Sequence, residues 1–244
     1  MSDINPAVRS ELAPTGTLRV GINLGNFLLT ATDPATGEYR GVAVDLAREL
    51  GRRLGVPVEI TGYPSPGALA DAARSGVWDV GFLGAEPQRA NEIDFTAAYV
   101  EIEATYLVPS GSPLKTIADV DRDGVRIAIS GKSAYDLYLT RTLKHARLVR
   151  IAGADNVFRQ FVDEKLEALA GLRPRLVKDH DNFPGSRILD GQFTAVQQAA
   201  GTPKGRPAGA QYLREFVEDI KATGLVARLI EKNGVRGLTV APKA

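Results

Sequence analysis

The chain has 244 residues, of which 44% are hydrophobic and 24% charged, and its formal net charge at pH 7 is +1. This length suffices for one large domain or two moderate ones, and a nearly neutral charge gives no electrostatic basis for binding nucleic acid or a membrane surface. Cysteine is absent, which excludes disulfides, thiolate metal sites and a cysteine nucleophile. We expect an ordinary globular protein without a metal or other cofactor.

The N-terminal segment is not expected to be an export signal. Residues 2–16 are polar, include Pro6 and Pro14, and lack a basic head followed by an apolar run of signal-peptide length. We expect this leader to be flexible. No stretch reaches the length of a membrane span, so direct membrane insertion is not expected. The chain as written is expected to be cytoplasmic, and periplasmic if a signal peptide has been removed from it.

The first hundred residues alternate between predicted strands and predicted helices. A strand at residues 17–24 precedes a helix at 43–54, whose apolar side chains recur at i, i+3, i+4, i+7 and i+11 before Gly55 ends it. A strand at 56–60, a helix between Ser65 and Gly76, and a strand at 78–83 follow. This alternation predicts a parallel sheet covered by helices.

The segment 79–99, DVGFLGAEPQRANEIDFTAAY, combines a buried strand, a bend and a helix start. Glu86 is a predicted helix cap and Pro87 a predicted first helical residue, which places Arg89 one turn into a helix. Ligands of open α/β sheets bind at the carboxyl ends of strands, where a guanidinium beside free amides is a receptor for a carboxylate. The alternative is that Arg89 only pairs with Glu86 or Glu92, at i±3 spacing on its own helix.

The rest of the chain predicts a second α/β set. Extended segments are expected at 99–109, 125–129, 148–151, 166–172 and 193–201, and helices at 134–145, around 157–162, around 213–220 and at 225–233. This order suggests an α/β protein of two lobes, between which the chain crosses twice. We place lobe I at residues 1–102 plus 200–244 and lobe II at 103–199, with hinge strands near 101–106 and 194–200.

Two segments resemble a known family. The first has the D-x-x-x-x-x-x-T-x-x-R and D-F-[ST]-x-x-Y pattern of the type II, amino-acid-type (family 3) solute-binding proteins of ABC transporters, except that Glu86 replaces the threonine. The second, residues 37–60, matches the family's helix with Asp45 but has Val42 in place of an aromatic residue. The residues that carry the first match are Asp79, Arg89, Asp94, Phe95, Thr96 and Tyr99.

This resemblance implies a fold and a function. The fold would be the two-lobed periplasmic-binding-protein-like II (Venus-flytrap) fold, whose lobes close around a ligand. The function would be non-catalytic binding of a small carboxylate-bearing solute, an amino acid or related organic acid, in the interlobe cleft. The chain would be the substrate-binding protein of an ABC transporter, with the permease as its partner, or an unexported relative. We expect a monomer that binds no nucleic acid.

The resemblance also implies a ligand-binding set. Arg89 would grip the carboxylate, and Ser133 would donate its hydroxyl to the same group. Leu172 stands where many amino-acid receptors have an aspartate for the ammonium group, so the ligand either lacks an α-ammonium or has its amine held elsewhere, with Glu86 as the candidate. The set is Asn23, Asn26, Phe27, Phe82, Leu83, Gly84, Glu86, Arg89, Ser130, Ser133, Ala134 and Leu172.

An enzyme on the same scaffold is the competing hypothesis. Cyclohexadienyl dehydratases resemble these receptors and eliminate water from prephenate or arogenate, which needs an acid near the leaving hydroxyl, and Glu86 is the candidate. The run SGKS at 130–133 is not a P-loop, because Arg126 stands where glycine is needed. His145 and His180 are isolated and are interpreted as surface residues. No catalytic residues are therefore predicted.

Overall fold

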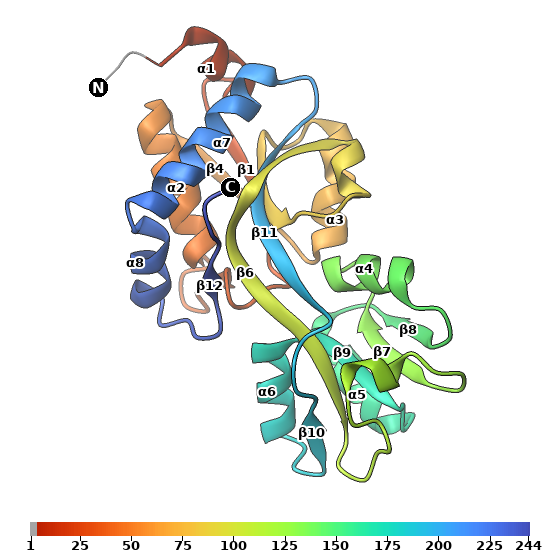
Figure 1. The fold of residues 1–244 in the computed structure, drawn as a ribbon. Helices are drawn as coiled ribbons and strands as arrows, with labels where there is room; N and C mark the ends of the chain where they lie inside the picture. Colours follow the sequence, from red (N-terminus) through yellow and green to blue (C-terminus); the bar gives the residue numbers. More distant parts are fainter. Residues whose placement is uncertain (1–3) are drawn as a thin grey trace. The chain divides into compact units, whose positions relative to one another are not determined.

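The computed structural model describes residues 4–244 and divides the chain into two compact units. Unit 1 is Met1–Glu101 with Gln197–Ala244, and unit 2 is Ile102–Val196. The chain leaves unit 1 along the long strand β6 (Ile93–Pro109) and returns along β11 (Thr194–Pro203). These two strands are the segments between the units that Figure 1 shows in yellow and light blue.

Unit 1 contains a mixed sheet in the order β4-β1-β5-β11-β6. Strand β1 (Leu18–Asn23) pairs in parallel with β4 (Val58–Tyr63) and β5 (Val80–Gly84), which confirms the parallel arrangement predicted from the alternating pattern. Strand β11, along which the chain returns to this unit, is antiparallel to β5, and this makes the sheet mixed. Short strands complete the unit: β2 (Ala31–Thr32) pairs with β3 (Tyr39–Arg40), and β12 (Thr239–Val240) pairs with β6.

Helices cover this sheet. Helix α2 (Val42–Leu54) ends at Gly55, whose φ of 67° is readily adopted only by glycine. Helix α3 (Pro66–Asp71) is capped by Ser65, whose Oγ accepts from Ala68 N at 3.1 Å, and continues as the 3-10 helix Ala72–Ser75. Helices α7 (Pro207–Ala222) and α8 (Leu225–Lys232) close the unit and lie beside α2 in Figure 1.

The expectation of a flexible leader is wrong, because residues 6–12 form helix α1 (Pro6–Leu12), which packs on α7. Asn5 caps it, Val8 and Leu12 are buried, and Arg9 Nε donates to Leu54 O at 2.9 Å. A side chain at Gly209 would place its Cβ 2.7 Å from Leu12, so this glycine makes room for the helix. Two apolar residues were too few to indicate a helix; burial against α7 supplies the rest.

Asp79 forms a buried clasp at the start of β5. Its carboxylate is fully buried and accepts from Arg19 Nε at 2.9 Å, from Arg19 Nη2 at 2.7 Å and from Arg206 Nη1 at 2.8 Å. Arg206 Nη1 also donates to Glu11 O at 2.8 Å. Asp79 therefore joins β1, β5, α1 and the segment before α7, which is a structural role.

Unit 2 contains strands in the order β6-β9-β7-β8. Strand β7 (Arg126–Ser130) is parallel to β8 (Arg147–Ile151) and β9 (Ala168–Leu172), whereas β9 and β10 (Ser186–Ile188) are antiparallel to β6. The helices are α4 (Ala134–Thr142), α5 (Ala154–Asp163), α6 (Arg173–Asp181) and the 3-10 helix Ile117–Val120. Two apolar clusters form the core of this unit, one containing Tyr106 and Ile127 and the other Leu107 and Phe161. No helix within residues 4–244 combines the length and apolar character needed to span a bilayer.

Candidate functional site

Arg89 follows strand β5 in unit 1, but not in an α-helix. The chain turns at Pro87 and Gln88, forms only the 3-10 helix Arg89–Asn91, and begins β6 at Ile93. The predicted helix start at Glu86 is therefore wrong. Eight residues separate Gly84 from Ile93, too few for a turn and a stable α-helix before a 17-residue strand. A three-residue helix offers no useful dipole, so Arg89 acts through its own charge.

The guanidinium of Arg89 is buried and oriented by backbone. The residue is 6% exposed, and its Nη1 donates to Gly84 O at 2.6 Å. Burial lowers the pKa of Arg89 to about 10, and the carboxylates of Glu86 and Asp71 oppose this shift. Arg89 thus remains protonated at neutral pH. The alternative that Arg89 interacts with Glu86 is consistent with this electrostatic interaction and does not exclude a ligand role.

The backbone that precedes Arg89 belongs to the sheet. Phe82 and Leu83 are paired with Ala200 and Ala199 of β11, and Phe82 also lies in register with Ile22 of β1. Both side chains are buried. Leu83 packs in an apolar cluster that includes residues of α3, and the centroids of the Phe82 and Tyr99 rings are 5.9 Å apart. Gly84 is the last residue of β5, and its carbonyl is committed to Arg89.

Asn23 and Asn26 lie at the carboxyl end of β1, next to the end of β5. Asn23 Oδ1 accepts from Gly25 N at 3.0 Å, and Asn26 Oδ1 accepts from Leu28 N at 3.2 Å. Thr30 Oγ1 donates to the carbonyl oxygens of Asn23 and Asn26 at 2.6 and 3.1 Å. Asn23 and Asn26 are thus buried in one ordered loop, with exposed fractions of 8% and 5%. Phe27 in the same loop is 47% exposed.

Unit 2 presents a second set of donors at the start of α4. Ser133 Oγ accepts from Asp136 N at 3.1 Å and so caps the helix. The hydroxyls of Ser130 and Ser133 lie near the phenol of Tyr135, whose pKa is raised by burial, an effect that the two hydroxyls oppose. The first-turn N–H groups, including that of Ala134, have no acceptor within their own helix, which suits an anion.

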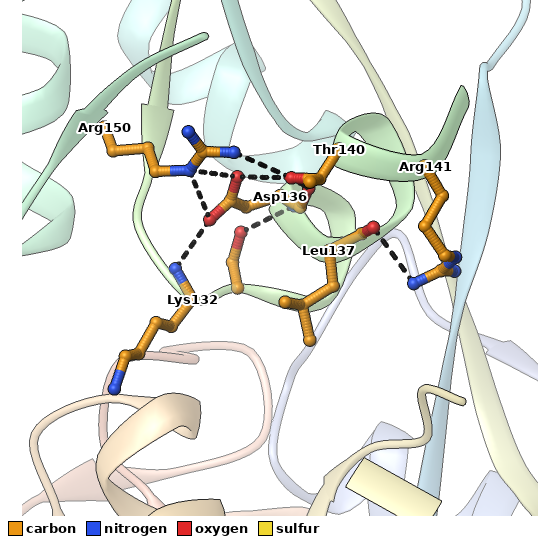
Figure 2. Close-up of polar contacts among 7 residues, drawn as sticks. Lys132, Asp136, Leu137, Thr140, Arg141 and Arg150 are labelled. Atoms are coloured by element: carbon orange, nitrogen blue, oxygen red, sulfur yellow. Dashed lines mark hydrogen bonds and ion pairs between the residues drawn. The ribbon is translucent and has the colours of Figure 1, made fainter. Parts of the chain in front are cut away.

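Asp136 holds this loop in place (Figure 2). The carboxylate, 3% exposed, accepts from Lys132 N at 2.8 Å and from Arg150 Nε at 2.9 Å. Arg150 Nη2 also donates to Thr140 Oγ1 at 2.7 Å. Lys132 has a φ of 58°, an uncommon conformation for a residue with a side chain. The carboxylate thus fixes a strained turn immediately before the helix start.

Leu172 ends β9 and packs with apolar residues of unit 2. Its neighbours are Ala104, Ala134 and Val196, together with the rings of Tyr135 and Phe193. The next residue, Arg173, donates through Nε to Glu103 Oε2 at 2.6 Å. An apolar side chain therefore occupies the end of this strand, beside the start of α4.

Within each unit, the structure brings part of the implied set together. In unit 1, the asparagine loop and the Gly84–Arg89 segment follow adjacent strands; in unit 2, Ser130, Ser133, Ala134 and Leu172 surround the start of α4. Their roles toward a ligand stay predictions. Three residues around the start of α4, Tyr135, Asp136 and Arg150, were not predicted from the sequence. The S-x-x-D spacing of Ser133 and Asp136 was a detectable capping signal for the second of these.

Other chemistry has little support. His180 Nδ1 lies 3.0 Å from Ser186 Oγ, but that hydroxyl donates to Phe183 O at 2.6 Å, so the serine is not poised to give its proton to the histidine. Within residues 4–244, no three His, Cys, Asp or Glu side chains gather in a way that would hold a metal ion.

Comparison with known families identifies the class of protein. The profile of the bacterial extracellular solute-binding proteins, family 3, matches residues 18–235. The chain belongs to this family. The resemblance noted at residues 79–99 and 37–60 is thereby confirmed, as is the two-lobed type II periplasmic-binding-protein fold. No curated protein gives a significant match.

Solved structures of the same fold cover nearly the whole of this solute-binding protein. The L-cysteine receptor of Neisseria gonorrhoeae is 20% identical, with a TM-score of 0.78 and coverage of 95% of both chains. The Streptococcus pneumoniae AbpA protein bound to L-arginine is 18% identical, with a TM-score of 0.74 and coverage of 91% of this chain and 96% of that one. An ancestral amino-acid-binding protein, a precursor of cyclohexadienyl dehydratase, is 22% identical, with a TM-score of 0.75 and coverage of 92% and 97%.

Proposed function

We propose that this protein binds a small carboxylate-bearing solute without transforming it, and that Arg89 is the receptor for the carboxylate. The observation that carries the proposal is a buried, protonated guanidinium at the carboxyl end of β5, held by Gly84 O at 2.6 Å. A planar guanidinium pairs with both oxygens of a carboxylate, and such pairs are stronger where water is excluded. Micromolar affinity would need about 8 kcal/mol in total.

The serine-rich start of α4 supports binding of an anionic group by unit 2. The carboxylate of Asp136 is already compensated by Arg150 and by Lys132 N, so it does not cancel the donors of the helix start. The hydroxyls of Ser130 and Ser133 and the amide of Ala134 lie in this segment. They are the donors that we assign to an anionic ligand in this unit.

The biological setting that fits the family is delivery of the solute to an ABC transporter permease. An unexported relative that senses or sequesters the same solute is the other form of this proposal. Both need the same binding reaction, and we expect the protein to act as a monomer. Co-purification with a permease would distinguish delivery from sequestration.

A lyase of the cyclohexadienyl dehydratase type is the alternative. Glu86 follows β5 and interacts electrostatically with Arg89, so it is an acid close to the proposed carboxylate receptor. Incubation with prephenate, followed by detection of phenylpyruvate, tests this activity. Turnover that is lost in Glu86→Gln would establish the lyase and overturn the non-catalytic proposal; the absence of turnover in a protein that binds the acid would support binding alone.

A thermal-shift screen tests the proposed function. Amino acids, organic acids and polyamines are added to the protein, because a ligand at a hundred times its dissociation constant stabilises the folded state by about 2.7 kcal/mol. We expect stabilisation by one or more carboxylates and none by polyamines. Stabilisation by amines without a carboxylate, or by no carboxylate at all, would contradict the proposal.

A further inference from the structure

The side-chain oxygens of Asn23 and Asn26 are both used by their own loop. Asn23 Oδ1 accepts from Gly25 N at 3.0 Å, and Asn26 Oδ1 accepts from Leu28 N at 3.2 Å. Rotating either amide by 180° would set its NH₂ group against a backbone N–H and lose the bond. The loop therefore fixes which end of each amide remains available.

The rest of the loop is too well ordered to release these amides. Thr30, which is buried, donates to the carbonyl oxygens of both asparagines, and Asn26 N donates to Asn23 O at 3.3 Å. A Cβ on Gly25 would lie 3.1 Å from Asn23 Oδ1 and 3.2 Å from Pro64 O. The oxygen atoms are thus enclosed by backbone.

The amide nitrogens, in contrast, donate to no group among residues 4–244. Each NH₂ group carries two donors and cannot accept. They follow β1, whose Ile22 is in parallel register with Phe82 of β5, the strand that leads to Arg89. The ends of two adjacent strands in unit 1 therefore present the same chemistry, hydrogen-bond donors.

An ammonium group placed against these two amides would meet hydrogen-bond donors only. The guanidinium of Arg89, on which Glu86 and Asp71 act electrostatically, is already a cation at this edge of unit 1. A buried ammonium needs oxygen acceptors, because burial without them is costly.

We infer that the ligand carries an oxygen acceptor, and no α-ammonium group, where it meets Asn23 and Asn26. The solute class is hydroxy acids, oxo acids and dicarboxylates, rather than α-amino acids. This inference rests on the proposed function, because Arg89 binds the carboxylate and the two amides donate hydrogen bonds to the neighbouring group. It narrows the class of solute that the carboxylate receptor accepts.

Pairs of solutes with matched carbon skeletons test the inference directly. Thermal shifts and calorimetric affinities are measured for aspartate and malate, glutamate and 2-oxoglutarate, alanine and lactate, leucine and 2-hydroxyisocaproate, and phenylalanine and phenyllactate. We expect binding by the oxygen-bearing member of at least one pair and affinity at least tenfold weaker for its amino partner. Tighter binding by an amino acid would overturn the inference.

The Asn23→Asp and Asn26→Asp variants test the assigned donors. Aspartate keeps the oxygen that accepts from the loop N–H, so the turn survives, but it replaces the NH₂ donor with a carboxylate oxygen. We expect each variant to bind the best oxygen-bearing solute at least about tenfold more weakly, because an acceptor oxygen of the protein then faces an acceptor oxygen of the solute. The preference between the two members of a pair should also shift toward the amino acid, and the effect should persist in 0.5 M salt, where distant charges are screened.

Asn5→Asp is the matched control. Asn5 is exposed, and its Oδ1 accepts from Ala7 N at 2.9 Å, the same i to i+2 pattern, in helix α1 ahead of the amino end of β1. We expect this variant to bind like the unmodified protein. Unchanged affinity and preference in both Asn23→Asp and Asn26→Asp would overturn the inference.

The two proposals fail in different ways. If amino acids bind best and Arg89→Ala removes that binding, the inference is wrong and the proposed function stands. If no carboxylate of the panel binds, or if Arg89→Ala leaves its affinity unchanged, the proposed function is wrong and the inference falls with it.

Discussion

The guanidinium of Arg89 is fixed to the end of β5, because its Nη1 donates to Gly84 O at 2.6 Å. The carbonyl holds one edge of the guanidinium and so orients the group relative to the sheet. Burial lowers its pKa to about 10 but leaves it charged at neutral pH. A buried cation of this kind is costly to maintain, and an anion that binds it recovers part of the desolvation energy.

The first prediction concerns stability and Asp79. Asp79→Asn should lower the free energy of unfolding by about 2–3 kcal/mol, because it removes the charge of a fully buried acceptor that binds two part-buried guanidiniums, those of Arg19 and Arg206. Urea unfolding, followed by circular dichroism, measures the change. The control is Asp219→Asn, which removes an exposed partner of Arg53 and should cost less than about 1 kcal/mol. Equal losses of unfolding free energy in the two variants would contradict the structural role of Asp79.

Much of the fold could be predicted from periodicity. The apolar stripe that ends at Gly55 located α2, and the strand-helix alternation indicated the parallel pairing of β4, β1 and β5. These features can be predicted from short-range patterns, because the spacing of apolar side chains and the residues that end a helix lie close together in the sequence. The family resemblance at residues 79–99 added the class of protein, which periodicity alone does not contain.

The missed features depend on long-range contacts. Helix α1 needs burial against α7, which lies about two hundred residues away along the chain, and a glycine at 209 to accept Leu12. The helix expected around Arg89 failed because the chain there continues directly into β6. At the candidate site, the donor character of Asn23 is set by a hydrogen bond to Gly25, which residue identity cannot reveal, since an amide both donates and accepts.

The second prediction compares two buried tyrosines. Tyr99 is fully buried, and its hydroxyl has no partner among residues 4–244, so Tyr99→Phe should change stability by less than about 0.5 kcal/mol or increase it. Tyr135→Phe should lower the free energy of unfolding by about 1 kcal/mol, because it removes a buried phenol that has the hydroxyls of Ser130 and Ser133 as polar neighbours. Urea unfolding of both variants decides this. A larger loss for Tyr99→Phe than for Tyr135→Phe would contradict it.

The third prediction is a pH dependence at Glu49. Arg52 and Arg53 lower the pKa of Glu49 from 4.5 to about 2, so its ion pairs stabilise the folded state above pH 4.5 and lose that effect as the pH falls toward 2. We expect Glu49→Gln to reduce stability at pH 7 by about 1 kcal/mol, a modest value because Arg52 is exposed.

Unfolding curves of the unmodified protein and Glu49→Gln at pH 7, 4 and 2.5 measure this dependence. The difference between the two proteins should narrow steadily as the pH is lowered. A difference that stays constant from pH 7 to 2.5 would show that the pKa of Glu49 is not depressed by its neighbours.

Calorimetric titration of Arg89 variants tests the central claim most directly. The best carboxylate from the screen is titrated into the unmodified protein, Arg89→Ala, Arg89→Lys and the exposed control Arg74→Ala, after each is shown to unfold cooperatively in urea. We expect no detectable binding to Arg89→Ala, at least about tenfold weaker binding to Arg89→Lys because lysine lacks the planar pair of donors, and unchanged binding to Arg74→Ala. Unchanged affinity in a folded Arg89→Ala or Arg89→Lys protein would contradict the account.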